Sequence, residues 1–150
     1  MFRNQSILII GYLLFILGIS MLLPSLWSLY YGENALIPIL QAMATTLGSG
    51  LLIIILFRNI EKKEITVRDS FTIVTLGWIT IVIFSALPFF FSGYLNYTNA
   101  FFEAMSGLTT TGATILGHST THQIEDLPYG LLFWRSFTQF IGGMGIIVFS

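Results

Sequence analysis

Three long apolar stretches constrain the fold of this chain more than any other feature. They cover residues 6–31, 35–57 and 71–91, and a fourth covers residues 131–149. A helix of roughly 20 residues spans about 30 Å of hydrocarbon, and each of the first three stretches reaches that length. Only 9% of the residues are charged, whereas soluble globular domains carry about 25%. The sequence therefore predicts an all-α integral membrane protein.

The first stretch is too long for the apolar core of a signal peptide, which has about 7–15 residues, so we expect a retained transmembrane helix. Pro24 is predicted to kink this helix, because proline removes a backbone donor and clashes with the preceding turn. Pro38 falls in the first turn of the second helix, where proline is tolerated.

Composition excludes several classes of function. The chain has no cysteine and therefore no disulfide or thiolate metal site. Its six basic residues give no nucleic-acid footprint. The sequence shows no pairing of a nucleophile with a base that would indicate an enzyme. His118 and His122 have helical metal-ligand spacing, but the surrounding GHSTTHQ is typical of an exposed loop.

The basic residues predict the orientation of the chain in the membrane. Arg3 precedes the first stretch, and the linker FRNIEKKEITVRDS holds four more: Arg58, Lys62, Lys63 and Arg68. Two crossings separate these sites, so both lie on one side, which the positive-inside rule assigns to the cytoplasm. Residues 92–127 then face outward and contain no lysine or arginine. We expect a multi-pass protein of the inner or plasma membrane with a cytoplasmic N-terminus.

Residues 92–127 have a different pattern from the spans that flank them. Asn96, Thr98 and Asn99 are candidate helix N-caps, and residues 100–108 form a short apolar run. About ten helical residues reach roughly 15 Å, half the bilayer. A threonine–glycine run follows, and then a polar return toward residue 127. Because both ends lie on the outer face, the pattern predicts a re-entrant pore helix and an extended loop.

The backbone of this loop is the candidate ion site. Irregular backbone at membrane depth must be buried in protein or line a wet cavity. Carbonyl oxygens there can replace the hydration shell of a cation, and the negative end of the short helix favours one. Glycine permits a backbone conformation that helps to aim successive carbonyls, and a threonine adds a hydroxyl oxygen. The predicted ion-binding residues are Thr110, Thr111, Gly112 and Ala113. Alternatively, such threonines bond helical carbonyls and the glycine only allows close packing.

Two charged residues, one before and one after this loop in the sequence, lie in apolar surroundings. Glu103 belongs to the short helix and Arg135 to the last apolar stretch. Because isolated charges in a membrane are costly, we predict that they pair and brace the two helices. The alternative is that each side chain extends separately to the outer interface.

Small residues are predicted to mark close contacts between helices. Gly142, Gly143 and Gly145 are expected to let the last helix approach the pore helix, with a gating hinge as the alternative. Ala44 and Gly48, four residues apart, are expected to pack the second helix against a neighbour.

Two segments, AFFEAMSGLTTTGATIL and LPYGLLFWRSFTQFIGGMGIIVF, resemble the first pore repeat of the Trk/Ktr/HKT superfamily, specifically of Trk-type potassium-uptake membrane subunits. The resemblance implies two leading helices followed by four helix–pore loop–helix repeats around one potassium pathway. It implies that Thr110 to Ala113 are this repeat's share of the selectivity filter, with K⁺ at Thr110 and Thr111, and that Thr109 ends the pore helix beneath it. The Tyr-Gly pair of ordinary potassium channels is absent after Gly112, so K⁺ over Na⁺ discrimination does not follow from the resemblance.

The resemblance also implies organisation and partners. Residues 1–69 would hold two leading helices and a cytoplasmic linker, and residues 70–150 the first repeat with a truncated last helix. The expected function is potassium uptake, with K⁺ as the transported ion and no other cofactor. The expected partners are the lipid bilayer, a second copy in a homodimer and a cytosolic nucleotide-binding RCK-type regulatory subunit. The alternatives are a non-conducting membrane scaffold and a proton-coupled secondary transporter.

Overall fold

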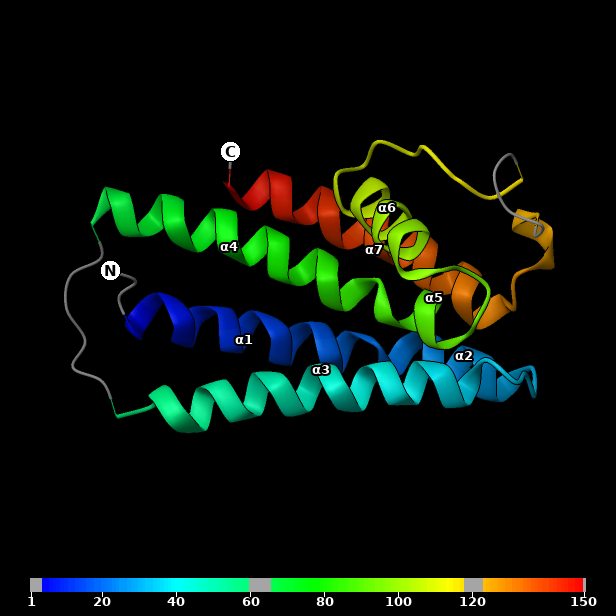
Figure 1. The fold of residues 1–150 in the computed structure, drawn as a ribbon, viewed down its shortest axis with the longest axis horizontal. Coiled ribbons are helices and arrows are strands. Elements are labelled where there is room, and N and C mark those ends of the chain that lie inside the picture. The colour runs from blue at the N-terminus through cyan, green and yellow to red at the C-terminus, as the bar shows by residue number, and fades with distance from the viewer. Residues whose placement is uncertain (1–3, 60–65, 118–122, 150) are drawn as a thin grey trace.

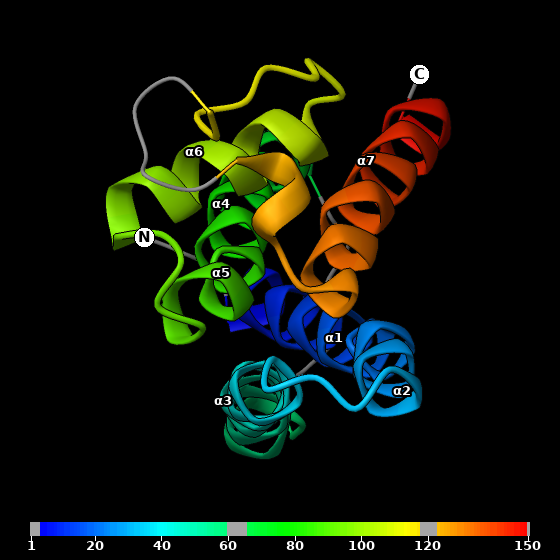
Figure 2. The same ribbon diagram turned by 90° about the vertical axis from the view of Figure 1, so that its right-hand side faces the viewer.

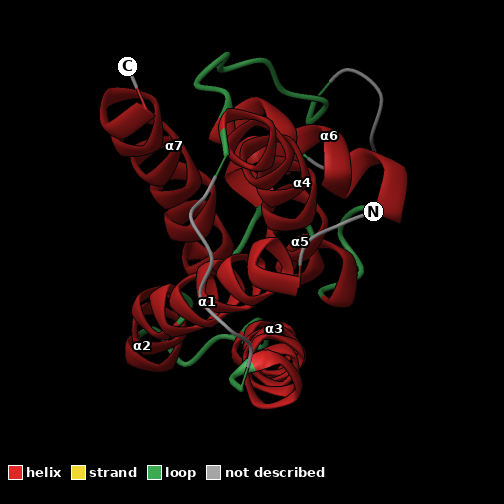
Figure 3. Cartoon of the chain, turned by 90° about the vertical axis from the view of Figure 1, so that its left-hand side faces the viewer, coloured by secondary structure: helices red, strands yellow, loops and turns green. Residues whose placement is uncertain are grey.

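A computed structural model describes residues 4–59, 66–117 and 123–149. Every regular element within these ranges is a helix (Figure 3), which confirms the predicted all-α class. Three described segments are long and apolar enough to cross a membrane: Gln5–Tyr30, Leu36–Phe57 and Asp69–Phe91. Their ends lie within two residues of the predicted stretches.

The first span is two helices with a break between them. Helix α1 covers Asn4–Ser20, helix α2 covers Leu22–Tyr30, and Met21 interrupts them. Pro24 lies four residues after Ser20 and has no backbone N–H to donate to its carbonyl. The regular series of helical hydrogen bonds is therefore interrupted at this turn. The predicted kink is confirmed.

The third span is interrupted in the same way, which the sequence analysis did not predict. Helix α4 covers Val67–Ser85 and helix α5 covers Leu87–Phe91, with Ala86 between them. Pro88 occupies the start of α5 and removes the donor that would continue α4. The proline was visible in the sequence and carries the same signal as Pro24.

Helix α3, Leu36–Phe57, holds Pro38 in its first turn as predicted. It packs against α1, and α4 packs on another side of α1. Seen from one end, α3 lies below α1, while α4 and α7 lie above it (Figure 2). The start of α1, the end of α3 and the start of α4 lie at one end of the molecule (Figure 1). Arg3, Lys62, Lys63, His118 and His122 lie outside the described residues.

One packing prediction for α3 is wrong. Ala44 and Gly48 are exposed, and a Cβ added to Gly48 would meet no atom of the described residues within 4 Å. The close contact is made by Gly50, whose added Cβ would lie 2.8 Å from the backbone nitrogen of Phe15. Gly48 and Gly50 are the same residue type two positions apart, so residue type alone did not show which of them packs.

The re-entrant path is formed by helix α6, Tyr97–Leu108. The side chain of Asn96 caps its start and accepts a 2.9 Å hydrogen bond from the backbone of Asn99. Its 12 residues correspond to about 18 Å of helix. In Figure 1, α6 starts near one end of the molecule and stops part-way along its length, and the chain then returns to the starting end, where the 3₁₀ helix Ile124–Asp126 lies.

The last helix, α7, covers Tyr129–Phe149 and contacts α6 and α2. Its start is fixed by Glu33 of the α2–α3 turn, whose carboxylate accepts from the backbone N–H groups of Tyr129 at 2.6 Å and Gly130 at 3.0 Å. Buried Trp134 donates its indole N–H to the carbonyl of Ser85 at 2.9 Å. These contacts anchor α7 to the α2–α3 turn and to the end of α4.

Candidate functional site

The threonine run does not continue α6 but ends it in a tight turn. The backbone N–H of Thr110 bonds the carbonyl of Gly107 at 2.9 Å, and that of Thr111 bonds the carbonyl of Ser106 at 3.0 Å. This pair of bonds defines a Schellman motif, whose left-handed position is usually glycine. Here that position is Thr110, with φ 55°. A β-branched residue in this region is a conformational outlier.

After this turn the chain is irregular from Thr111 to Ile115. Gly112 has φ 75°, a conformation that favours glycine. Within the described part of the chain, the carbonyl oxygens of Thr110, Thr111 and Gly112 accept no hydrogen bond. The three residues are exposed. The loop therefore offers three consecutive backbone oxygens that no neighbouring donor occupies.

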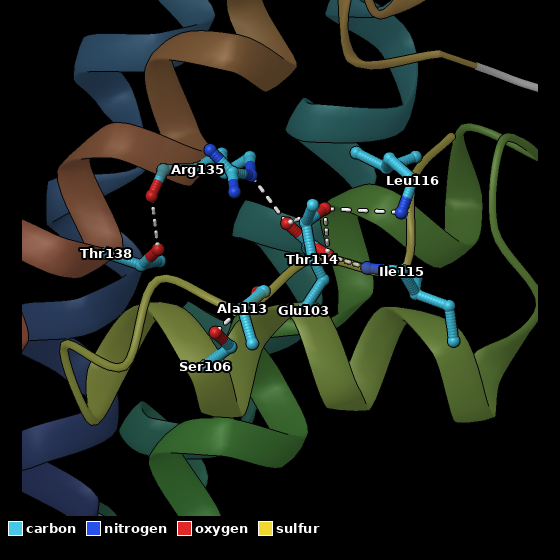
Figure 4. Close-up of polar contacts among 8 residues, drawn as sticks. All are labelled: Glu103, Ser106, Ala113, Thr114, Ile115, Leu116, Arg135 and Thr138. Atoms are coloured by element: carbon cyan, nitrogen blue, oxygen red, sulfur yellow. Dashed lines mark hydrogen bonds and ion pairs between the residues drawn. The ribbon is translucent and has the colours of Figure 1, made fainter. Parts of the chain in front are cut away.

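Ala113, the fourth predicted ion-binding residue, differs from these three. Its carbonyl accepts a 2.6 Å hydrogen bond from the hydroxyl of Ser106 on α6 (Figure 4). The predicted set thus divides into three free carbonyls and one that is bonded to the pore helix.

Thr109 lies at the C-cap of α6. Its hydroxyl donates to the carbonyl of Met105 at 2.8 Å and lies 2.8 Å from the hydroxyl of Thr111. Thr110 turns its own hydroxyl to the carbonyl of Thr109 at 2.7 Å. The three threonines are therefore linked through hydroxyls at the end of the helix.

The predicted ion pair between α6 and α7 is present. The Nε of Arg135 lies 2.5 Å from a carboxylate oxygen of Glu103. Glu103 is 2% exposed, so it does not extend to an interface as the alternative required. Its carboxylate also accepts from the hydroxyl of Thr114 at 3.0 Å and from the backbone N–H of Ile115 at 3.2 Å (Figure 4). One buried carboxylate joins the pore helix, the returning loop and the last helix.

The helices α6 and α7 approach closely at two glycines. A Cβ on Gly142 would lie 2.6 Å from the carbonyl carbon of Leu108, and a Cβ on Gly107 would lie 2.5 Å from the hydroxyl of Thr138. Gly142 thus has the packing role predicted for it. Cβ atoms on Gly143 and Gly145 would make ordinary contacts, at 3.8 Å to Thr110 and 3.7 Å to Trp78.

Sequence reasoning missed Ser106 and Thr114 as parts of the site. Ser106 follows Glu103 by three residues and therefore shares its face of the helix. A serine and a carboxylate on one face of a pore helix are donors and acceptors for a loop that folds back along it. That spacing was a usable signal for Ser106, whereas the partner of Thr114 depends on the path of the loop.

Comparisons with known proteins agree with this architecture. Residues 39–150 match the family model TrkH, described as a cation transport protein. The Trk system potassium uptake protein TrkH of Vibrio parahaemolyticus is 38% identical over 149 residues, which cover 98% of this chain and 30% of that protein. The corresponding protein of Escherichia coli K12 is 40% identical over 144 residues, covering 95% of this chain and 29% of the relative.

The fold also matches a solved structure. The crystal structure of the potassium transporter TrkH from Vibrio parahaemolyticus superposes with a TM-score of 0.87 at 39% identity, covering 99% of this chain and 31% of that one. This chain thus spans about 30% of the length of the relatives it matches. With three helical segments able to cross a bilayer, it is a multi-pass membrane protein, and it belongs to the TrkH family of cation transport proteins.

Proposed function

We propose that this chain takes part in potassium uptake by supplying one of four selectivity-filter segments of a channel-like Trk-type transporter. The observation that carries the proposal is the row of three carbonyl oxygens, Thr110 to Gly112, which accept no hydrogen bond from any described residue and follow a half-length helix. The relatives named potassium uptake proteins support the choice of ion. K⁺ would bind at Thr110 and Thr111, the Gly112 carbonyl would complete the coordinating oxygens, and Ala113 would end the segment where its carbonyl bonds to Ser106.

The physical basis is substitution of water by backbone oxygens. A dehydrated cation needs a shell of oxygen ligands, and carbonyl dipoles supply them without a fixed negative charge. The C-terminal end of α6 adds a partial negative charge near the loop. A potential of about 100 mV contributes about 2.3 kcal/mol per charge, so a selective path alone can drive accumulation.

The supporting residues have defined roles in this proposal. Thr109 closes the pore helix through its hydroxyl bond to Met105 and orients Thr111. Glu103 and Arg135 hold the loop and α7 against the pore helix. The network disfavours a proton relay, because the carboxylate is already engaged by three donors: Arg135, Thr114 and Ile115.

Orientation and partners complete the proposal. The excess of basic residues around the first helix and the α3–α4 linker supports a cytoplasmic N-terminus and an outward-facing filter loop. We also propose that residues 1–69 and 70–150 are the leading unit and the first repeat. A homodimer and a cytosolic nucleotide-binding RCK-type regulator are the partners to test with the full-length protein.

The proposal is tested by adding one methyl group at the filter. In the full-length protein, Gly112→Ala forces alanine into a left-handed conformation, and we expect K⁺ uptake by proteoliposomes to fall about tenfold or more. Gly48→Ala is the matched control, because its added methyl group meets nothing within 4 Å. A folded Gly112→Ala protein with parental uptake and parental K⁺:Na⁺ preference would favour the scaffold alternative.

A further inference from the structure

We propose that Ser106 is a positioning residue that sets where the ion-exposed part of the loop ends. By holding the Ala113 carbonyl on α6, it limits this segment's coordinating backbone oxygens to those of Thr110, Thr111 and Gly112. The inference rests on the proposed function and adds a specificity-determining residue that itself touches no ion.

The first argument is the unusual partner of the Ser106 hydroxyl. The buried hydroxyls of Ser25 and Thr46 donate to the carbonyl four residues earlier, and that of Thr138 donates to the carbonyl three residues earlier. This local bond is the ordinary choice for serine and threonine in membrane helices. Ser106 is 6% exposed, yet its hydroxyl reaches forward seven residues to Ala113, at 2.6 Å.

The second argument is that Ser106 bonds the loop on both sides of Gly112. Its backbone carbonyl accepts from the N–H of Thr111 at 3.0 Å, and its hydroxyl donates to the carbonyl of Ala113. Gly112 is the residue between these two anchors and has φ 75°. One residue of α6 therefore fixes both neighbours of the filter glycine.

The third argument is the sharp boundary that results. Before Ala113, three successive carbonyls accept no hydrogen bond within the described part of the chain. From Ala113 onward the chain is tied to α6, first by Ser106 and then by Glu103, which binds Thr114 and Ile115. Ser106 makes the first of these ties, and Figure 4 shows it beside the Glu103 contacts.

Loss of the hydroxyl has a consequence for selectivity. Without it, the Ala113 carbonyl has no donor on α6 and is free to turn toward the pathway as an additional oxygen ligand. Discrimination between K⁺ and Na⁺ depends on the number and orientation of the coordinating oxygens. A change in the ligand set should therefore alter the ratio of K⁺ to Na⁺ uptake, which a loss of stability alone would not do.

The test compares Ser106→Ala and Ser106→Cys in the full-length protein, with K⁺ and Na⁺ uptake measured in proteoliposomes. We expect the K⁺:Na⁺ ratio to fall about fivefold for Ser106→Ala, the scale of losing one hydrogen bond, and less for Ser106→Cys, whose thiol is a weak donor. Ser25→Ala removes a buried hydroxyl with a purely helical partner and should keep the parental ratio. If Ser106→Ala does not fold, the K⁺:Na⁺ ratio of Ser106→Cys alone tests the proposal.

The outcomes separate this inference from the function on which it rests. If Gly112→Ala changes transport but both Ser106 variants keep the parental ratio, the positioning role is wrong and the proposed function stands. Equal loss of K⁺ and Na⁺ uptake in the Ser106 variants would also reject it, since that is the effect of a merely structural bond. If Gly112→Ala has no effect either, the proposed function fails, and this inference with it.

Discussion

Thr110 has the most strained backbone of the described non-glycine residues, since it alone among them has a positive φ, at 55°. The Schellman turn places a left-handed residue one position before the free carbonyls of Thr111 and Gly112, and a glycine there would relieve the strain. Residues held in such conformations concentrate at functional sites, where the surrounding structure fixes them. Thr110 gains a hydroxyl bond to Thr109 that glycine would lack. The strain at Thr110 is therefore consistent with a functional need for its side chain.

Glu103 and Arg135 allow a direct test of the network behind the loop. Separate Glu103→Gln and Arg135→Gln changes each leave a charge without its partner, and removing one member of a buried pair costs about 3–5 kcal/mol. We expect both variants to show a clearly lowered unfolding temperature in detergent and reduced K⁺ uptake. Glu125→Gln, an exposed change in the 3₁₀ helix, is the control. Parental unfolding temperatures in both single variants would show that the pair does not support the pore helix.

The sequence predicted this pair because charge is so scarce in the apolar segments. With 9% charged residues overall, an acid in the pore helix and a base in the next helix had few other partners. The bonds of Ser106 and Thr114 could not be derived in the same way. Their partners depend on the direction in which the loop leaves α6, and the left-handed Thr110 that sets this direction has no sequence signature.

At the scale of elements, the contact between α6 and α7 depends on one glycine of an adjacent pair. A methyl group on Gly142 would lie 2.6 Å from the Leu108 carbonyl carbon, whereas on Gly143 its nearest neighbour is Thr110, at 3.8 Å. Gly142→Ala should lower stability by about 1–3 kcal/mol through overpacking. Gly143→Ala should be neutral or slightly stabilising, because alanine favours a helix by up to about 1 kcal/mol.

Thermal unfolding of the two full-length variants, measured side by side, checks this prediction. Both carry the same chemical change on the same helix, so each is the control for the other. If the two variants unfold at the same temperature, then α7 does not depend on close approach at Gly142. A normal stability of Gly143→Ala combined with lost transport would instead favour the hinge alternative for this glycine.

Element boundaries were predictable because length and hydropathy fix a membrane span, whereas packing faces were not. The first three predicted stretches agree with the membrane-capable segments of the structure to within two residues. The breaks follow from the missing donors of Pro24 and Pro88. The packing prediction for Ala44 and Gly48 was wrong because it was based on residue type and spacing alone, and the fold shows that Gly50 is the glycine that faces α1.

At the scale of the whole molecule, one filter segment cannot surround an ion. A coordination shell requires oxygens from several sides, and the described part of this chain supplies one such loop, on one side of α6 and α7 (Figures 1 and 2). The chain also spans about 30% of the relatives it matches. We therefore expect residues 1–150 alone, purified and reconstituted in proteoliposomes, to give no K⁺ flux above that of empty vesicles.

The informative comparison is the full-length protein in the same vesicles, with circular dichroism used to establish that the shorter chain is helical. We expect the shorter chain to be helical without K⁺ flux and the full-length protein to give K⁺ flux. This result would agree with a pathway that needs further segments. A K⁺-selective flux from residues 1–150 would contradict this expectation, because it would mean that identical copies of one loop assemble around an axis. Cross-linking would then count those copies, and the one-chain arrangement of four different segments would no longer be required for coordination.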